Sequence, residues 1–300
     1  MTTHMRQHLL LIAGLVLVTF SSCTKEEVSP DGPLVNDPGP RLILKFRFDS
    51  TQVRLNNLGQ PSAIPAGHGA QSPRFNSMSA HYVEFAPTAL TALGQGKVVY
   101  HAPETTLGGA TAIDHDLGIS VGDGGTFLDI PLSSLQPGSY DWLRVSLAYQ
   151  NYDIRFRAFS TLYTGTIASF IGYNTYIGSV LVKDSTVNVN TNKLQGFWAF
   201  EVNDPPTSTP VETGQAPGTT VPNPIFATSP IPAGSCVVTG AFAQALTITG
   251  DETEDVVIVV SLSTNKSFEW LETDANNIFD PINGETVVDM GVRGMVPIVQ

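Results

Sequence analysis

The residues of this chain most able to do chemistry are four histidines that lie close together in the sequence. All of them fall between residues 68 and 115, and they are His68, His81, His101 and His115. Imidazole is the commonest side-chain ligand for zinc and copper, and ligands on neighbouring strands can converge on one ion. The grouping therefore predicts a metal site.

Two of these histidines lie at the ends of predicted strands. His81 begins a predicted strand at 81–86, and His101 directly follows another at 97–100. If the two strands pair antiparallel, the two side chains lie at the same end of the sheet. These two residues are the expected centre of the site.

The other two histidines lie on predicted loops, from which they are expected to close the site. Asp114 and Asp116 flank His115 and are expected to orient its ring as hydrogen-bond acceptors. The alternative is that the four histidines are scattered over loops, since none forms a close His-x-His or His-x3-His pair. Spacing alone leaves both interpretations open.

A second candidate site is a segment of oxygen ligands near the C-terminus. Counted as a calcium-binding loop, positions 1, 3, 7 and 12 are Asp274, Asn276, Asp280 and Glu285. Position 5 is Ile278, and position 6 is Phe279 where the sharp turn needs glycine. The segment therefore predicts either a calcium site of different geometry or a polar turn between two strands.

Aromatic residues suggest a rival function that needs no metal. Trp142, Trp198 and Trp270, with Tyr163, Tyr173 and Tyr176, are candidates for a flat platform that binds sugar rings or a protein. The alternative is that these rings pack in the core, as most aromatics do.

Sequence motifs typical of enzymes are not found. The chain has no Gly-x-Ser-x-Gly, no His-Glu-x-x-His and no phosphate-binding loop. Its glycine-rich turn at 121–125 leads into a predicted strand, so it offers no helix N-terminus to an anion. We therefore expect a non-catalytic binding protein.

The N-terminus resembles a lipoprotein signal peptide, predicted over residues 1–22. A weakly basic start precedes an apolar stretch at 9–18 that is too short to span a bilayer, and Ser21-Ser22-Cys23 closes the segment. Small residues before a cysteine resemble the lipobox of bacterial lipoproteins, although Phe20 stands where leucine is usual. This resemblance implies that Cys23 is lipidated and becomes the mature N-terminus; the alternative is an ordinary cleaved signal.

The residues that follow Cys23 indicate a location. Lys25-Glu26-Glu27 resembles the export signal of Bacteroidota-type lipoproteins, which implies a lipid anchor in the outer membrane and exposure at the cell surface. Residues 23–40 are rich in proline, glycine and acids, which predicts a flexible tether. The expected membrane contact is the lipid itself.

Composition narrows the class of partner. The chain has 15 basic and 27 acidic residues, for a formal net charge of −12. Nucleic acids and anionic membrane surfaces both need a basic face, so neither is an expected partner. If Cys23 carries lipid, Cys236 has no partner for a disulfide, and a buried thiol is expected there.

Hydrophobic periodicity predicts an all-β protein. Leu42, Leu44, Phe46 and Phe48 alternate with Ile43, Lys45 and Arg47 in a period of two. The run at 256–260 is continuously apolar, as in a strand covered on both faces. Residues 61–73 and 103–116 are predicted loops, and 203–235 is a Pro/Thr-rich excursion. We predict a single domain at 41–300, an antiparallel β-sandwich (jelly-roll or immunoglobulin-like) with long loops.

The order of three segments resembles a known family. These are the strand LILKFRFD, the turn NNLGQP with a long histidine-bearing middle, and the strand entry LQPGSYDWLRVSL. They resemble the methanobactin-associated periplasmic copper-binding proteins, the MbnP-like family, over residues 42–147. The resemblance implies a β-sandwich that holds copper through histidines, and it favours copper over calcium. It identifies no individual ligand in this chain.

Two functions follow from these patterns. The first is a non-catalytic, membrane-anchored lipoprotein that binds a metal ion, copper before zinc, through some of the four histidines. The alternative is a surface glycan- or protein-binding β-sandwich module without metal.

Lipidation at Cys23 is directly testable. We expect the wild-type protein to enter the detergent phase on phase partitioning, and Cys23→Ala to stay in the aqueous phase, because the lipid anchor needs the thiol. Globomycin should block processing of the wild type. A Cys23→Ala protein that stays membrane-bound would contradict the assignment, and protease treatment of intact cells would report the orientation.

Overall fold

The computed structural model describes residues 39–56, 58–203, 211–216 and 236–300. The signal peptide, Cys23 and nearly all of the predicted tether lie outside the described residues, as does most of the 203–235 excursion. Gly39–Gln300 forms one compact unit that contains every sheet and core cluster described below. A chain that begins at Thr24 therefore keeps the whole folded unit.

The chain begins this unit in a four-stranded sheet, here called the β1 sheet. Its order is β19 (Met295–Val299), β16 (Val256–Ser263), β1 (Arg41–Asp49) and β8 (Thr126–Pro131). The predicted alternation is present in β1, where Leu42, Leu44 and Phe46 are completely buried. β1 and β16 pair parallel, whereas the outer pairs of this sheet are antiparallel.

The second sheet, the β9 sheet, has eight strands and is organised by one long strand. β9 (Gly138–Ala158) has 21 residues and is paired along both edges. The order is β14 (Glu212–Gln215), β13 (Phe197–Asn203), β10 (Thr161–Phe170), β9, β3 (Arg74–Ala86) and β4 (Lys97–His101), with β15 (Cys236–Ile248) on β9 and β7 (Ser120–Val121) on β3.

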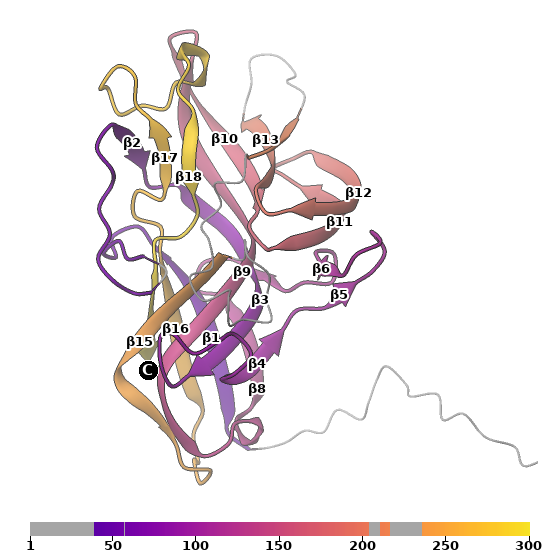
Figure 1. Ribbon diagram of the computed structural model, residues 1–300, viewed down its shortest axis with the longest axis vertical. Helices are drawn as coiled ribbons and strands as arrows, with labels where there is room; N and C mark the ends of the chain where they lie inside the picture. The colour runs from indigo at the N-terminus through magenta and orange to yellow at the C-terminus, as the bar shows by residue number, and fades with distance from the viewer. Residues whose placement is uncertain (1–38, 57, 204–210, 217–235) are drawn as a thin grey trace, which may run out of the picture. The chain divides into compact units, whose positions relative to one another are not determined.

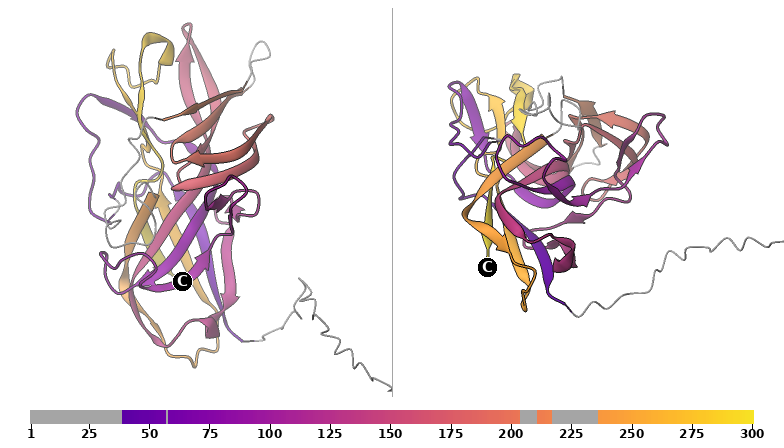
Figure 2. Two further views of the ribbon diagram at one scale, coloured as in Figure 1. Left: turned by 45° about the vertical axis from the view of Figure 1, so that its right-hand side comes forward. Right: turned by 60° about the horizontal axis from the view of Figure 1, so that its bottom comes forward.

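Two smaller sheets lie on opposite sides of the β10–β13 part of the β9 sheet (Figures 1 and 2). The β17 sheet contains β18 (Val287–Met290), β17 (Phe268–Leu271) and β2 (His68–Gln71). The β11 sheet contains β12 (Thr186–Leu194), β11 (Asn174–Leu181), β6 (Ala112–Asp114) and β5 (Glu104–Thr105). The helices within the described residues are two short 3-10 turns, η1 (Leu132–Ser134) and η3 (Pro281–Asn283).

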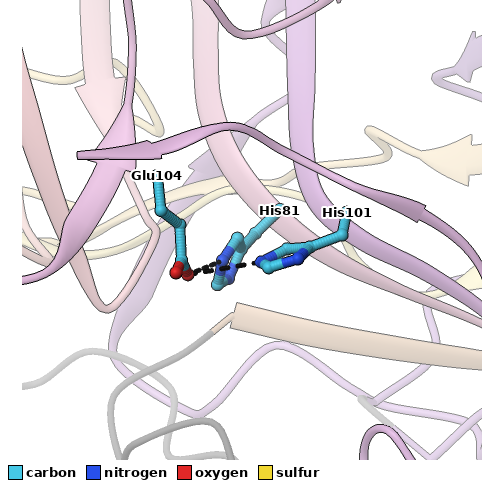
Figure 3. A group of neighbouring side chains, drawn as sticks. All are labelled: His81, His101 and Glu104. Atoms are coloured by element: carbon cyan, nitrogen blue, oxygen red, sulfur yellow. Dashed lines mark hydrogen bonds and ion pairs between the residues drawn. The ribbon is translucent and has the colours of Figure 1, made fainter. Parts of the chain in front are cut away.

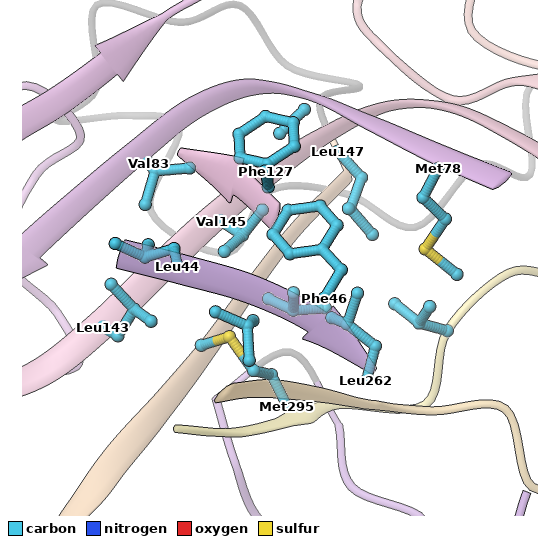
Figure 4. Packing of buried hydrophobic residues seen from close by; sticks show 14 of the residues in the cluster. Leu44, Phe46, Met78, Val83, Phe127, Leu143, Val145, Leu147, Leu262 and Met295 are labelled. Carbon is cyan, nitrogen blue, oxygen red and sulfur yellow. The ribbon is translucent and has the colours of Figure 1, made fainter. Parts of the chain in front are cut away.

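The main hydrophobic core joins the facing sides of the β1 and β9 sheets (Figure 4). Phe46 of β1 stacks on Phe127 of β8 with ring centroids 4.3 Å apart, and both rings are buried. Val145 and Leu147 of β9 belong to the same cluster. The predicted all-β, mainly antiparallel β-sandwich is thus confirmed.

Several local predictions were wrong where a strand depends on its partner. Residues 61–73 and 103–116 were expected to be loops, but they contribute β2, β5 and β6. His81, expected at the start of a strand at 81–86, lies inside β3 instead. β19 was missed because it contains Pro297, which is tolerated since β19 lies at the edge of its sheet.

Truncation of Phe46 should test the core. We expect Phe46→Ala to lower the free energy of unfolding by about 3–5 kcal/mol, the usual cost of removing a buried phenylalanine ring. Urea unfolding of the variant would measure this cost. Phe159 is 83% exposed, so Phe159→Ala is the matched control and should change stability by less than about 0.5 kcal/mol. Similar losses in the two variants would contradict the proposed core.

Candidate metal centre

The position of His81 is set by an irregularity in the pairing of β3 with β9. Ala80 pairs with Leu147, and Tyr82 pairs with Ser146, the residue adjacent to Leu147 on β9. His81 therefore has no partner on β9 and is the extra residue of a β-bulge. A bulge redirects the side chain of its extra residue and often lies beside a functional site. The His81 carbonyl accepts a hydrogen bond from the Ala102 amide at 2.8 Å, which ties the bulge to the chain just after β4.

The pairing of β3 with β4 places the other two residues of the cluster beside His81. β4 runs antiparallel to β3, and its last residue, His101, pairs with Tyr82 directly beside the bulge. Two residues after Ala102 the chain enters β5, which begins at Glu104. The sequence expectation that His81 and His101 lie at the same end of a paired sheet is therefore met.

Three side chains converge at this point (Figure 3). The Nε2 atom of His81 lies 2.9 Å from Oε1 of Glu104, and Nε2 of His101 lies 3.3 Å from the same oxygen. One ligand atom from each of the three residues lies within 4.8 Å of the others. His81 is 3% exposed, while His101 is 43% exposed, so the cluster is anchored in the interior and open to solvent on one side.

Burial determines the charge state of the central imidazole. Desolvation lowers the pKa of His81 to about 4, although the hydrogen bond and charge of Glu104 act in the opposite direction. For Glu104, burial alone would raise the pKa, but hydrogen bonds from His81 and His101 lower it below its ordinary value. At neutral pH the pair is thus a neutral imidazole beside a carboxylate, the forms that ligate metals.

Two tyrosines surround the cluster. The Tyr173 hydroxyl donates to Oε1 of Glu104 at 3.4 Å, and Tyr82 stacks on His101 with ring centroids 4.2 Å apart. Burial and the nearby Glu104 charge raise the pKa of Tyr173 to about 12, so its hydroxyl keeps its proton. These contacts help to orient Glu104 and His101.

The arrangement can bind a transition metal. Two imidazole nitrogens and one carboxylate oxygen form a donor set that suits zinc or copper, and a solvent molecule can complete the coordination. An ion at this point would bond to the ring nitrogens and the carboxylate oxygen that now lie close to one another. Glu104 was missed by sequence reasoning; its signal is the His-x-x-Glu spacing from His101.

The other two histidines lie in different surroundings. His68, on β2, places Nδ1 3.2 Å from Oε2 of Glu269, whose other oxygen bonds Arg54 at 2.5 Å and Arg293 at 3.1 Å. This buried charge network joins the β17 sheet to the loop that follows β1. His68 therefore belongs to a structural hydrogen-bond network around Glu269.

His115 packs among aromatic rings. Its ring centroid lies 4.8 Å from that of Tyr149 and 4.9 Å from that of Phe170, and burial lowers its pKa. The predicted role of Asp114 as an orienting acceptor for this ring is not observed. Its carboxylate instead accepts hydrogen bonds from the backbone amides of Asp116 and Leu117 and holds a turn.

In the predicted calcium segment, two of the predicted ligands lie beside Glu272, a residue just before the segment. Glu272, Asp274 and Glu285 place one oxygen each within 4.8 Å of the others, and burial raises the pKa of Glu272. Asp280 instead caps η3, and Asn276 bonds to Asp274. Two of the four predicted ligands therefore lie in the acidic cluster.

The three tryptophans do not form one platform. Trp270 is fully buried against Phe268 and Phe279 of the core, so it offers no exposed face. Trp142 and Trp198 are partly exposed but lie on β9 and β13, which are not adjacent in the sheet. Cys236 is partly buried, and desolvation raises the pKa of its thiol to about 12, as expected for an inert cysteine.

Comparison with known proteins does not assign the chain to a family. No protein-family model, curated protein or solved structure matches it. The resemblance to copper-binding proteins stays a prediction. Among the described residues, no helix is long and apolar enough to cross a membrane.

The depressed pKa of His81 predicts a pH dependence of stability for the metal-free protein. An unfolded histidine titrates near pH 6.5, so between about pH 6.5 and 4 the unfolded state binds more protons at this residue. We expect the free energy of unfolding to fall by about 3 kcal/mol from this residue as pH decreases through that window. Urea unfolding at several pH values measures the slope.

The control variant for this titration is His81→Gln, which keeps a hydrogen-bond donor for Glu104 but cannot titrate. The free energy of unfolding of this variant should depend less steeply on pH, by an amount that corresponds to at most one fewer proton taken up on unfolding. Some slope should remain, because burial also lowers the pKa of His115. Equal slopes in the two proteins would contradict a buried, neutral His81.

Proposed function

We propose that this protein is a non-catalytic, lipid-anchored metal-binding protein whose centre is formed by His81, His101 and Glu104. The observation that supports this most directly is the convergence of two imidazole nitrogens on one carboxylate oxygen, at 2.9 and 3.3 Å. The bulge in β3 adds support, because it directs His81 toward the end of β4. The low pKa of His81 keeps its imidazole neutral at neutral pH, so a metal ion does not have to compete with a second ring proton.

Copper is the preferred metal and zinc the second. A site with two imidazoles and a carboxylate binds copper(II) more tightly than zinc in the general order of divalent-metal affinities. The resemblance of residues 42–147 to a copper-binding family points the same way. The oxygen-only cluster of Glu272, Asp274 and Glu285 would suit calcium, but backbone amides of the same loop already donate hydrogen bonds to Glu272 and to both oxygens of Glu285.

The proposed location comes from the leader. The lipobox-like Cys23 and the following Lys25-Glu26-Glu27 support an outer-membrane lipoprotein that faces the cell surface. A metal-binding domain with a lipid anchor would keep its ion at the cell envelope, because the protein itself cannot diffuse away. The acidic net charge of −12 favours the approach of cations.

The alternative, a glycan- or protein-binding module, has less support. Of the three tryptophans proposed for its platform, Trp270 is buried in the core. Trp142 and Trp198 each keep an accessible part, but on separate strands.

Metal titration of the untagged, metal-stripped protein tests the proposed centre. We expect one equivalent of copper(II) to bind, with zinc weaker, by isothermal titration calorimetry and elemental analysis. His81→Gln, His101→Gln and Glu104→Gln should each lower copper affinity by at least about tenfold, the scale of losses when a metal site is perturbed. The largest loss is expected for His81, because its strand holds it most rigidly.

Matched controls come from the two histidines outside the cluster. His68→Gln and His115→Gln should leave copper affinity unchanged, provided that circular dichroism shows both variants folded. Less than stoichiometric metal in the wild type, or equal losses in all the histidine variants, would remove the proposed function.

A further inference from the structure

A cavity of about 430 Å³ lies between the β9 and β17 sheets, away from the metal centre. One wall carries Phe156, Trp198 and Phe200 of β9 and β13, and the opposite wall carries Phe279, Val287 and Met290. None of these residues belongs to the His81 cluster. From this cavity we infer a second binding site, for a small, uncharged, largely apolar molecule such as one with an aromatic ring system.

The aromatic wall is held open by glycines at two strand positions. A Cβ atom at Gly214 would lie 2.4 Å from the Trp198 ring, and one at Gly165 would lie 2.2 Å from the Phe200 ring. Both contacts are impossibly short, so with any other residue at these positions the Trp198 and Phe200 rings would have to move. Glycine is unfavourable within strands, and its use here lets both rings lie directly on the neighbouring backbone.

The chemistry of the lining determines the class of ligand. None of the described residues that line the cavity carries a charge, and its polar side chains are Gln215 and Thr286. The Gln215 amide nitrogen already donates to the Gln195 carbonyl at 2.8 Å. A charged ligand would lose its hydration without compensation, whereas an apolar body with one donor for the Gln215 oxygen would be satisfied.

The size of the cavity favours a small molecule over a peptide. Ligand sites in proteins usually measure about 300–1,000 Å³, and this cavity falls in that range. An α-helix about 10 Å wide would fill a similar volume with a single turn of about 5.4 Å, too little for a docked helix.

The test uses the chain that begins at Thr24 and N-phenyl-1-naphthylamine, an uncharged aromatic probe whose fluorescence rises in apolar surroundings. We expect saturable binding of one probe per protein, and a urea midpoint that rises with probe concentration, because the probe binds only the folded state. Val287→Trp, which fills the cavity, and Trp198→Ala, which removes part of its wall, should each weaken binding at least tenfold.

Two control variants separate binding in this cavity from binding elsewhere on the protein. Phe159→Ala removes a highly exposed aromatic ring outside the cavity and should leave probe affinity unchanged. His81→Gln should also leave it unchanged, so failure of the metal site and failure of this site are distinguishable. If Val287→Trp proves unstable in urea, Val287→Phe provides a smaller filling change that should weaken binding in the same direction.

Non-saturable binding, or filled and wild-type cavities of equal affinity, would overturn the inference. So would a loss of binding in Phe159→Ala, because the probe would then bind the exposed hairpin tip.

Discussion

The arrangement of the whole unit depends on how β9 changes partners along its length. The first half of β9 pairs with β15 and the second half with β10, and β3 runs along its other edge. The exchange occurs at Ala148, whose carbonyl accepts hydrogen bonds from the amides of Ile171 and Gly172 just after β10. Because Ala148 is an extra residue in β9, the ladder with β3 is shifted there and is restored by the bulge at His81.

This compensation links the architecture to the candidate metal centre. A one-residue shift reverses which face each side chain occupies, so an uncompensated irregularity would take Val83 and Phe85 out of the core. With both bulges in place, these residues stay completely buried, while His81 turns toward the end of β4. The residue that restores the register is therefore also the one that the cluster needs.

The most buried charged residues that the structure describes form pairs with residues of opposite charge. Glu84 and Arg144 are both almost completely buried, 3.6 Å apart, and Glu84 also accepts hydrogen bonds from the amides of Gly94 and Gly96. Glu269 is held between Arg54 and Arg293. His81 differs, because desolvation keeps it neutral, and one of its nitrogens, Nδ1, is buried without a hydrogen-bond partner among the described residues. His81 is thus a neutral group whose Nε2 atom lies beside a carboxylate, as a metal ligand requires, whereas the paired charges serve the fold.

The sequence by itself determined the class of fold and the pairing at the centre of the site. The fold class can be read from short segments of sequence. The alternation in β1 and the apolar run in β16 show which faces of these strands are buried, and each pattern lies within one strand. His81 and His101 were predicted correctly to meet because they lie on two strands that are neighbours in sequence and pair antiparallel. Only the tertiary structure decided which residues complete or leave the cluster. His68 binds Glu269 because β2 pairs with β17, a strand about 200 residues further along the chain, and no local pattern encodes that pairing. Glu104 lies only three residues after His101, but the turn of the chain from β4 into β5 decides that its side chain faces the histidines. Trp270 illustrates the same limit, since an aromatic residue in a strand has the same local signal whether its face meets solvent or the core.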